Sequence, residues 1–498
     1  MKRTVQLSIL AGVFGTLACA AEPALTIYNA NFAVVRDLIQ MNLPKAGANE
    51  IHYAGVAMHL EPDSVILRDP TGKRFLQVLE QNFRNDPVSQ ELMLSLFEGK
   101  TIDFETARTL TNGQTKLEII EGKIVRSGYT PHYISYDEDQ GYRAQQGMQP
   151  VIEVDGKLRF SLPGQPLFPA LADDTILKPT LSWLIQADKP GRLDVELGYI
   201  TSGIKWDADY NLVAPEVGDT LDLVGWITIN NQSGKTFDRA KIKLMAGDVN
   251  KVQKRPRAYA RAKMSMAMDA EAGEANVTEK AFDEYHLYTL ARATTLRDHE
   301  MKQVEFVRGA GIKAKPIYVY DGAQVAAFEG WNYEMIRNNQ EYGTESNRKV
   351  FVMREFKNSE TNGLGMALPK GKLRFYRRDT DGQLQFTGEN VIDHTAKDEL
   401  IRVTLGNAFD LVGERKRSNY KMDARNHWID ESFEIKVRNH KKTAVEIRVV
   451  ERLYRGDNWE VKEKSDDFTK KNSHTIEFPV QVKPDEEKVV TYTVHYTW

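Results

Sequence analysis

Short segments with a period of two dominate the sequence from Leu25 onward. In Leu193–Tyr199, for example, Leu, Val, Leu and Tyr alternate with Asp, Glu and Gly. Such alternation indicates a strand with one buried face and one face in water. Gly, Pro, Asn and Asp separate the segments, and these residue types favour turns. The pattern predicts a mainly β, multi-domain protein built from antiparallel sandwich and barrel modules.

The central alternating segments also suggest how strands pair. Residues 221–229 and 242–246 flank the polar stretch Asn230–Gly234, whose residues tolerate positive φ. A short connection favours antiparallel pairing, so we expect these two segments to lie side by side. The last hundred residues alternate in the same way and predict a separate sandwich.

Helices are expected to be few. Val88, Leu92 and Leu96 recur at helical spacing after Asp86-Pro87, which suits a helix start. This segment is the clearest helix, and the whole chain is expected to contain one or two short ones.

One stretch of the chain breaks the strand pattern. Residues 256–281 are poor in large apolar side chains, so they are expected to form a mobile insertion. Their methionines, Met264, Met266 and Met268, are thioethers that can bind Cu(I), but no other soft ligand lies nearby and no cofactor is expected.

The segments group into five parts along the chain. The expected parts are a signal peptide (1–20), an N-terminal β domain (21–85), a small barrel-like domain beginning with a helix (86–170), a β domain containing the insertion (180–395) and a C-terminal β-sandwich (396–498).

The first twenty residues have the order of a secretory signal. Lys2 and Arg3 precede an apolar stretch, and Ala18-Cys19-Ala20 offers a small-residue cleavage site. We therefore expect export to the periplasm or the medium. An alternative is lipid anchoring at Cys19, although Thr16 stands where lipoprotein signals usually place Leu.

The charge and the hydropathy of the sequence argue against a nucleic-acid partner and against a transmembrane helix. The net charge is −3, whereas nucleic-acid binding needs a clustered basic excess. No run of 18 apolar residues occurs, so no transmembrane helix is expected. The sequence leaves the oligomeric state open.

Motifs for common chemistries are also missing from the sequence. It contains no His-Glu-x-x-His, no Gly-x-Ser-x-Gly and no Gly-rich phosphate loop. Carboxylates are the remaining candidates for a chemical site. Asp207 and Asp209 share a strand face, and Asp248 can meet them across a sheet. Such acids can hold Ca²⁺ or act as acid and base on a glycan. The plainer interpretation, which we favour, is that they are solvated or cap turns.

Aromatic residues offer a second candidate surface. Large aromatic faces can bind carbohydrate or protein, although most belong to ordinary cores. The candidates are Trp331, Tyr333, Phe375, Tyr376, Trp428 and Trp459.

Several blocks resemble the family catalogued as domain of unknown function 4139. The resemblance covers roughly residues 190–498 and implies an exported, β-rich protein with no catalytic residues to transfer. The blocks are Gly203–Tyr210, Gly225-Trp226, Asn231–Gly234, Lys243–Asn250, Glu284–Leu290 and Gly406–Leu411.

Two functions follow from these observations. The leading hypothesis is a non-enzymatic interaction protein that engages an envelope protein or a glycan through strand edges, loops or aromatics. The alternative is a carboxylate- or Ca²⁺-dependent hydrolase acting on glycan or peptide.

Overall fold

The structure is a computed structural model, and it confirms the mainly β prediction. Strands make up 63% of it and helices 4%. The α-helices in the described part of the chain are α1 (Gln90–Leu96) and α2 (Tyr333–Asn338). The structure describes residues 22–498 except 110–112, 130–135, 138–140, 143–147, 172–174, 248, 250, 252–276, 283–284, 324–330 and 457.

The chain divides into two compact units. The first contains the residues up to Lys205, Asn230–Lys243 and Arg292–Met301. The second contains Trp206–Ile229, Leu244–Ala291 and Lys302–Trp498.

Antiparallel sheets form most of the first unit. β1 pairs with β2, β2 with β14 and β14 with β4, while β20 pairs with β17. β13 lies between β3 and β5. The alternation predicted for Leu193–Tyr199 is confirmed, since Val195, Leu197 and Tyr199 are buried in β14. The strands are β1 (Ala24–Tyr28), β2 (Phe32–Leu43), β3 (Gly47–Ala54), β4 (Ile66–Arg68), β5 (Leu76–Arg84), β13 (Thr180–Ala187), β14 (Gly191–Ser202), β17 (Phe237–Ala246) and β20 (Thr294–Leu296).

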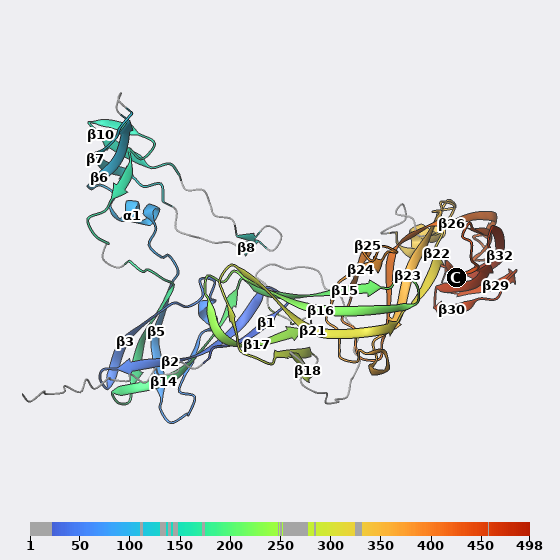
Figure 1. The fold of residues 1–498 in the computed structure, drawn as a ribbon, viewed down its shortest axis with the longest axis horizontal. Helices are drawn as coiled ribbons and strands as arrows, with labels where there is room; N and C mark the ends of the chain where they lie inside the picture. The colour runs from blue at the N-terminus through green and yellow to red at the C-terminus, as the bar shows by residue number, and fades with distance from the viewer. Residues whose placement is uncertain are drawn as a thin grey trace, which may run out of the picture. The chain divides into compact units, whose positions relative to one another are not determined.

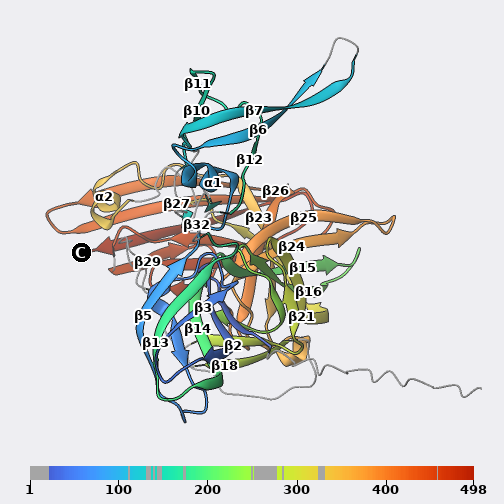
Figure 2. The same ribbon diagram turned by 90° about the vertical axis from the view of Figure 1, so that its left-hand side faces the viewer.

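A five-stranded sheet with order β11-β10-β7-β6-β12 also belongs to the first unit (Figure 2). The helix predicted from Val88 onward is α1. The Ser89 hydroxyl accepts a hydrogen bond from the Leu92 amide and caps it. Met93 and Leu94 then pack against the sheet residues Phe104 and Ile124. The strands are β6 (Thr101–Thr109), β7 (Thr115–Arg126), β10 (Val151–Val154), β11 (Lys157–Arg159) and β12 (Gln165–Leu167), with a separate pair β8 (Tyr136–Asp137) and β9 (Gly141–Tyr142).

The second unit contains a five-stranded sheet with order β21-β16-β15-β24-β25. β15, β16 and β21 run side by side in Figure 1. β15 pairs in parallel with β24, and Trp206 and Tyr210 of β15 are fully buried. The strands are β15 (Ile204–Ala214), β16 (Thr220–Asn231), β21 (Glu300–Lys313), β24 (Gly371–Arg378) and β25 (Leu384–Ile392).

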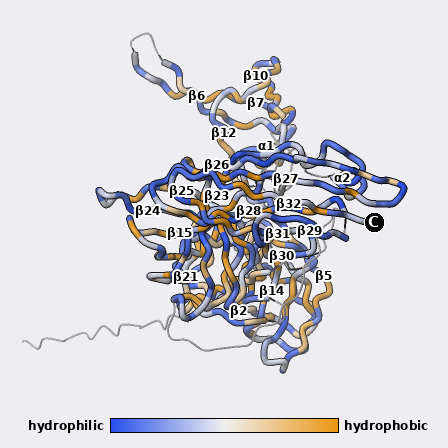
Figure 3. The backbone as a smooth tube through the Cα atoms, turned by 90° about the vertical axis from the view of Figure 1, so that its right-hand side faces the viewer, coloured by the Kyte–Doolittle hydropathy of each residue, from blue (hydrophilic) through white to orange (hydrophobic). Residues whose placement is uncertain are grey.

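A nine-stranded sheet occupies much of the rest of this unit, in the order β29-β32-β27-β26-β23-β22-β28-β31-β30. Buried and partly buried residues alternate along β27 and β28, and Figure 3 shows hydrophobic and hydrophilic residues mixed in this part of the chain. The buried set includes Phe433, Ile447, Phe478 and Tyr492. The strands are β22 (Lys315–Tyr320), β23 (Lys349–Lys357), β26 (Leu400–Asp423), β27 (Trp428–Asn439), β28 (Val445–Arg452), β29 (Asn458–Lys464), β30 (Thr469–Asn472), β31 (Thr475–Val482) and β32 (Glu486–Thr497).

The antiparallel pair predicted for 221–229 and 242–246 is wrong. β16 pairs with β15 and β21, whereas β17 has other neighbours. Asn231 ends β16 fully buried, and its amide donates to the carbonyls of Lys235, Leu296 and Arg297. These bonds give buried carbonyls at this strand end a donor. The alternation of each segment is as predicted, but a period of two does not say which strand lies alongside.

Two further asparagines repeat this arrangement in the second unit. Asn439 ends β27, and its amide donates to the carbonyls of Thr443, Val482 and Lys483. Asn358 follows β23 and donates to the carbonyls of Met366, Thr395 and Ala396. Both side chains are fully buried. Each asparagine therefore ties the end of one strand to a segment distant in sequence.

Several predicted segments fall outside the described residues. They are the signal peptide with Cys19, and residues 256–276 of the insertion with Met264, Met266 and Met268. The end of the insertion lies in β18 (Val277–Phe282), which pairs with β19 (Tyr285–Leu290). Within the described ranges, no helix has the length and apolar character needed to cross a membrane.

Candidate functional site

The acidic candidates do not form a shared site in the described structure. Asp207 is exposed and Asp209 is partly buried on the same face of β15, while Asp248 lies outside the described residues. Asp209 Oδ1 accepts a hydrogen bond from Arg374 at 3.2 Å, and its Oδ2 accepts one from the Thr228 hydroxyl at 3.1 Å. Both oxygens are therefore engaged in cross-strand contacts. Among the described residues, no group of three His, Cys, Asp or Glu side chains could hold a metal ion.

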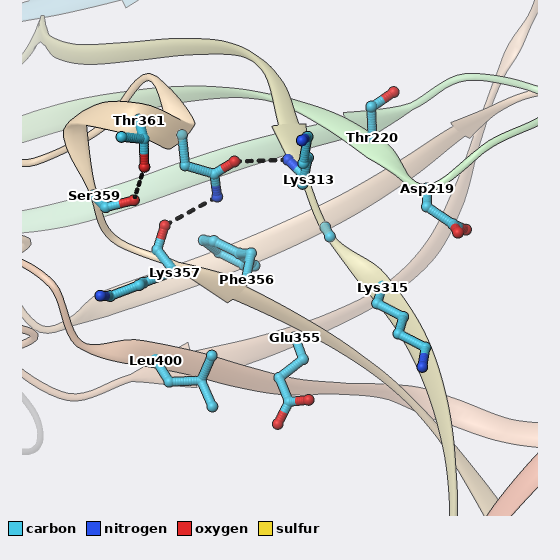
Figure 4. A pocket seen from close by; sticks show the side chains of 12 residues that line it. Asp219, Thr220, Lys313, Lys315, Glu355, Phe356, Lys357, Ser359, Thr361 and Leu400 are labelled. Atoms are coloured by element: carbon cyan, nitrogen blue, oxygen red, sulfur yellow. Dashed lines mark hydrogen bonds between the residues drawn. The ribbon is translucent and has the colours of Figure 1, made fainter.

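Two cavities in the second unit offer alternatives. The first, which we call the lysine cavity, has a volume of about 620 Å³ (Figure 4). Lys313 and Lys315 at the junction of β21 and β22, together with Lys357 of β23, supply its positive charges. Lys357 is largely exposed and lies 3.7 Å from Asp398. Cations this accessible remain hydrated and bind anions weakly.

Glu355 gives the lysine cavity a partly buried acid. Its Oε1 accepts two hydrogen bonds from Arg402, at 2.9 and 2.6 Å, and its Oε2 accepts one from Arg448 at 3.5 Å. The carboxylate is thus held between two guanidinium groups on β26 and β28. This arrangement is a structural ion-pair network, and it leaves Glu355 little freedom to act as a base.

The second cavity, which we call the arginine cavity, has a volume of about 440 Å³. Apolar and aromatic residues contribute most of its wall, and its charged residues are Asp219, Arg354 and Arg377. The other lining residues are Ala214, Gly218, Leu221, Pro316, Tyr318, Val352, Phe375, Tyr376, Thr387, Leu405, Gly406 and Asn407.

Strand pairing explains how the wall of the arginine cavity forms. Pro316 and Tyr318 of β22 stand opposite Arg354 and Val352 of β23. Because side chains two apart on a strand share a face, these four belong to one surface of the nine-stranded sheet. The opposite wall comes from β24, β25 and the turn that joins β15 to β16.

A glycine allows the two sheets to meet beside this cavity. Gly388 of β25 has φ +151°, and a Cβ there would lie 2.1 Å from the Leu405 carbonyl oxygen of β26. No side chain fits at that distance, so only glycine permits this approach.

Arg354 is the most unusual residue of the arginine cavity. Its side chain is only 6% exposed. Its guanidinium has five N–H donors, and within the described part of the chain it makes one hydrogen bond, from Nη1 to the Ala314 carbonyl at 2.8 Å. The nearest acid, Asp219, lies 4.0 Å away and is 67% exposed. Burial lowers the pKa of Arg354, and the nearby Arg377 lowers it further. This guanidinium is buried without a close counter-ion.

Arg377 adds a second positive charge that the turn between β15 and β16 holds in place. Its Nη2 and Nε donate to the Glu216 carbonyl at 2.7 and 3.3 Å. Gly218 of the same turn has φ +116°, which lets the backbone bend there. The turn therefore positions both Arg377 and Asp219 at the cavity.

Sequence reasoning missed the charged part of this site. Arg354, Arg377 and Asp219 lie far apart in the sequence and match no motif. Two predicted aromatic candidates, Phe375 and Tyr376, do line the cavity. Trp428 contacts His495 and Trp459 contacts Lys470, so these tryptophans have other neighbours.

The fold and the cavity together define a modular, all-β protein with an aromatic-walled, cationic pocket. The chain belongs to the family described as "Domain of unknown function (DUF4139)", whose model matches residues 195–498. The predicted resemblance is therefore confirmed. No curated protein matches the chain.

Proposed function

We propose that this protein is an exported, non-enzymatic binding protein that captures an anionic partner or ligand in the arginine cavity. The observation that carries the proposal is the buried Arg354 guanidinium with four unused donors beside an aromatic wall. The N–H groups of Arg354 that have no protein acceptor are open to the cavity, so a bound anion can accept them as charge-assisted hydrogen bonds.

The surroundings of Arg354 support binding rather than catalysis. Among the described residues, Asp219 is the one acid on the cavity wall, so the wall offers no pair of carboxylates for acid and base catalysis. The hydrolase alternative depends on Asp207, Asp209 and Asp248. Of these, Asp209 has both oxygens engaged by Arg374 and Thr228.

Export follows from the signal-like order of residues 1–20 and remains part of the proposal. The test is Edman sequencing or intact-mass measurement of the protein purified from its native host. Ala21 as the first residue is the expected result. Recovery of a cytosolic protein that begins at Met1 would refute export, and a lipid-modified Cys19 would replace soluble export with anchoring.

Binding is tested by calorimetric titration with two small anionic probes, 3-phenylpropanoate and phenyl phosphate. At least one probe should bind the wild-type protein, and Arg354→Gln should weaken that binding at least about tenfold, because hydrogen bonds to a charged group are worth ~1.5–3 kcal/mol. Arg378→Gln is the matched control, since Arg378 is an exposed neighbour outside the cavity wall. If neither probe binds, or if Arg354→Gln binds as well as wild type, the proposal fails.

A further inference from the structure

We propose that the arginine cavity selects a monocarboxylate attached to an apolar or aromatic body. This inference rests on the proposed function and names its ligand class. Three features of the cavity carry it: the net charge of the wall, the unused donors of Arg354 and the apolar residues around them.

The net charge of the cavity wall matches a ligand that carries one negative charge. Arg354 and Arg377 contribute two formal positive charges and Asp219 one negative charge, which leaves a net charge of +1 (2 − 1). Arg377 and Asp219 are exposed and screened by solvent, so the buried Arg354 contributes most to the field in the cavity. A carboxylate neutralises this wall, whereas a phosphate monoester near pH 7.5 carries about two negative charges and leaves an excess. Removing a dianion from water costs more than removing a monoanion, and a wall with one net positive charge offsets little of that extra cost, so the site favours the carboxylate.

The donor arrangement also suits a carboxylate. Arg354 uses Nη1 for the Ala314 carbonyl, so Nε and Nη2 remain for a ligand. Two parallel N–H groups of a guanidinium match the two oxygens of a carboxylate. Arg377 is already anchored to the Glu216 carbonyl, so it supplies mainly charge.

The rest of the wall favours an apolar body. Leu221, Pro316, Val352 and Leu405 line the cavity together with three aromatic residues, Tyr318, Phe375 and Tyr376. Tyr376 is fixed by an edge contact with Phe386 at 5.9 Å between ring centroids. A volume of about 440 Å³ falls within the range of small-molecule pockets. A body such as a phenyl group would exchange water for these side chains.

Such a carboxylate has two sources, a free organic acid or the C-terminus of a polypeptide that ends in an apolar residue. The experiment includes both. The wild-type protein is titrated with 3-phenylpropanoate, with its amide and with phenyl phosphate. It is also titrated with a short peptide that ends in phenylalanine, as the free acid and as the amide.

We expect a free acid to bind at least about tenfold more tightly than its amide and than phenyl phosphate. Binding of the small acid assigns the source to free acids, and binding of the peptide acid alone assigns it to polypeptide ends. Equal binding of acid and amide would overturn the selectivity. Arg354-dependent binding of phenyl phosphate that matches or exceeds that of the acid would overturn the monocarboxylate inference and leave the proposed function standing.

Asp219→Asn provides a second test that does not depend on a buried substitution. Asp219 is 67% exposed, so this variant should fold normally. The wall then carries +2, and the preference for the acid over phenyl phosphate should shrink severalfold or reverse. An unchanged ratio in a folded Asp219→Asn protein would show that the wall charge does not set the selectivity.

Discussion

Replacing Asn439 with alanine tests how the nine-stranded sheet of the second unit is held together. Asn439 is fully buried at the end of β27. Its Nδ2 lies 2.9, 3.0 and 3.2 Å from the carbonyl oxygens of Thr443, Val482 and Lys483, and its Oδ1 accepts the Lys441 amide at 2.9 Å. One side chain thus joins the ends of β27 and β31 with the turn that leads to β28.

The expected cost follows from these bonds. An amide group has two donor hydrogens, so two of the three carbonyl contacts are full hydrogen bonds, and the Lys441 amide supplies a third. At about 1 kcal/mol for each buried bond, Asn439→Ala should lower the free energy of unfolding by about 3 kcal/mol. The carbonyls of Val482 and Lys483 would lose a donor within the protein.

The assay combines denaturant unfolding with amide hydrogen exchange. Asn439→Ala should lower the unfolding midpoint and raise exchange at the ends of β27 and β31. The matched control is Asn426→Ala in an exposed turn, where the amide donates only to the Asp423 carboxylate at 2.7 Å. If both variants lose the same small amount of stability, backbone pairing alone holds these strand ends and the reasoning is refuted.

Two further predictions concern ionisable groups. Glu451→Gln should destabilise the second unit by roughly 3–5 kcal/mol, because Glu451 forms a fully buried ion pair with Arg415 at 2.9 Å. Glu460→Gln, in an exposed pair, should leave the melting temperature unchanged, and equal melting of the two variants would contradict this. Burial lowers the pKa of His59 from 6.5 to about 4, so between these values the unfolded chain binds a proton that the folded chain does not. The stability of the first unit should therefore fall as the pH drops through that window, and a slope that persists in His59→Gln would assign it elsewhere.

Alternation along the chain was enough to predict the fold class and many individual strands. β27 buries every second residue, and Val195, Leu197 and Tyr199 of β14 are buried as expected. α1 was predicted from its apolar spacing after Asp86-Pro87, and the structure adds Ser89 as its N-cap. The pairing of 221–229 with 242–246 was predicted wrongly. A period of two says which side chains face the core, but it does not say which strand lies alongside.

The candidate site was harder to predict. Asp209 was correctly placed on a strand face, yet only the structure shows its carboxylate between Arg374 and Thr228. Arg354 looks like any other polar residue of an alternating strand. Its burial depends on the neighbouring sheet, which comes close at Gly388.

The sequence by itself determined that the chain is β-rich, that it has a signal-like start and that it belongs to its family. Face alternation and turn residues act locally, so the sequence shows them directly. Tertiary structure alone decided that Asn231, Asn358 and Asn439 join distant strand ends. It also brought Asp219, Arg354 and Arg377 to one cavity. These choices depend on contacts between segments far apart in the chain, where burial and unmet hydrogen bonds set the energy, and no local pattern records them.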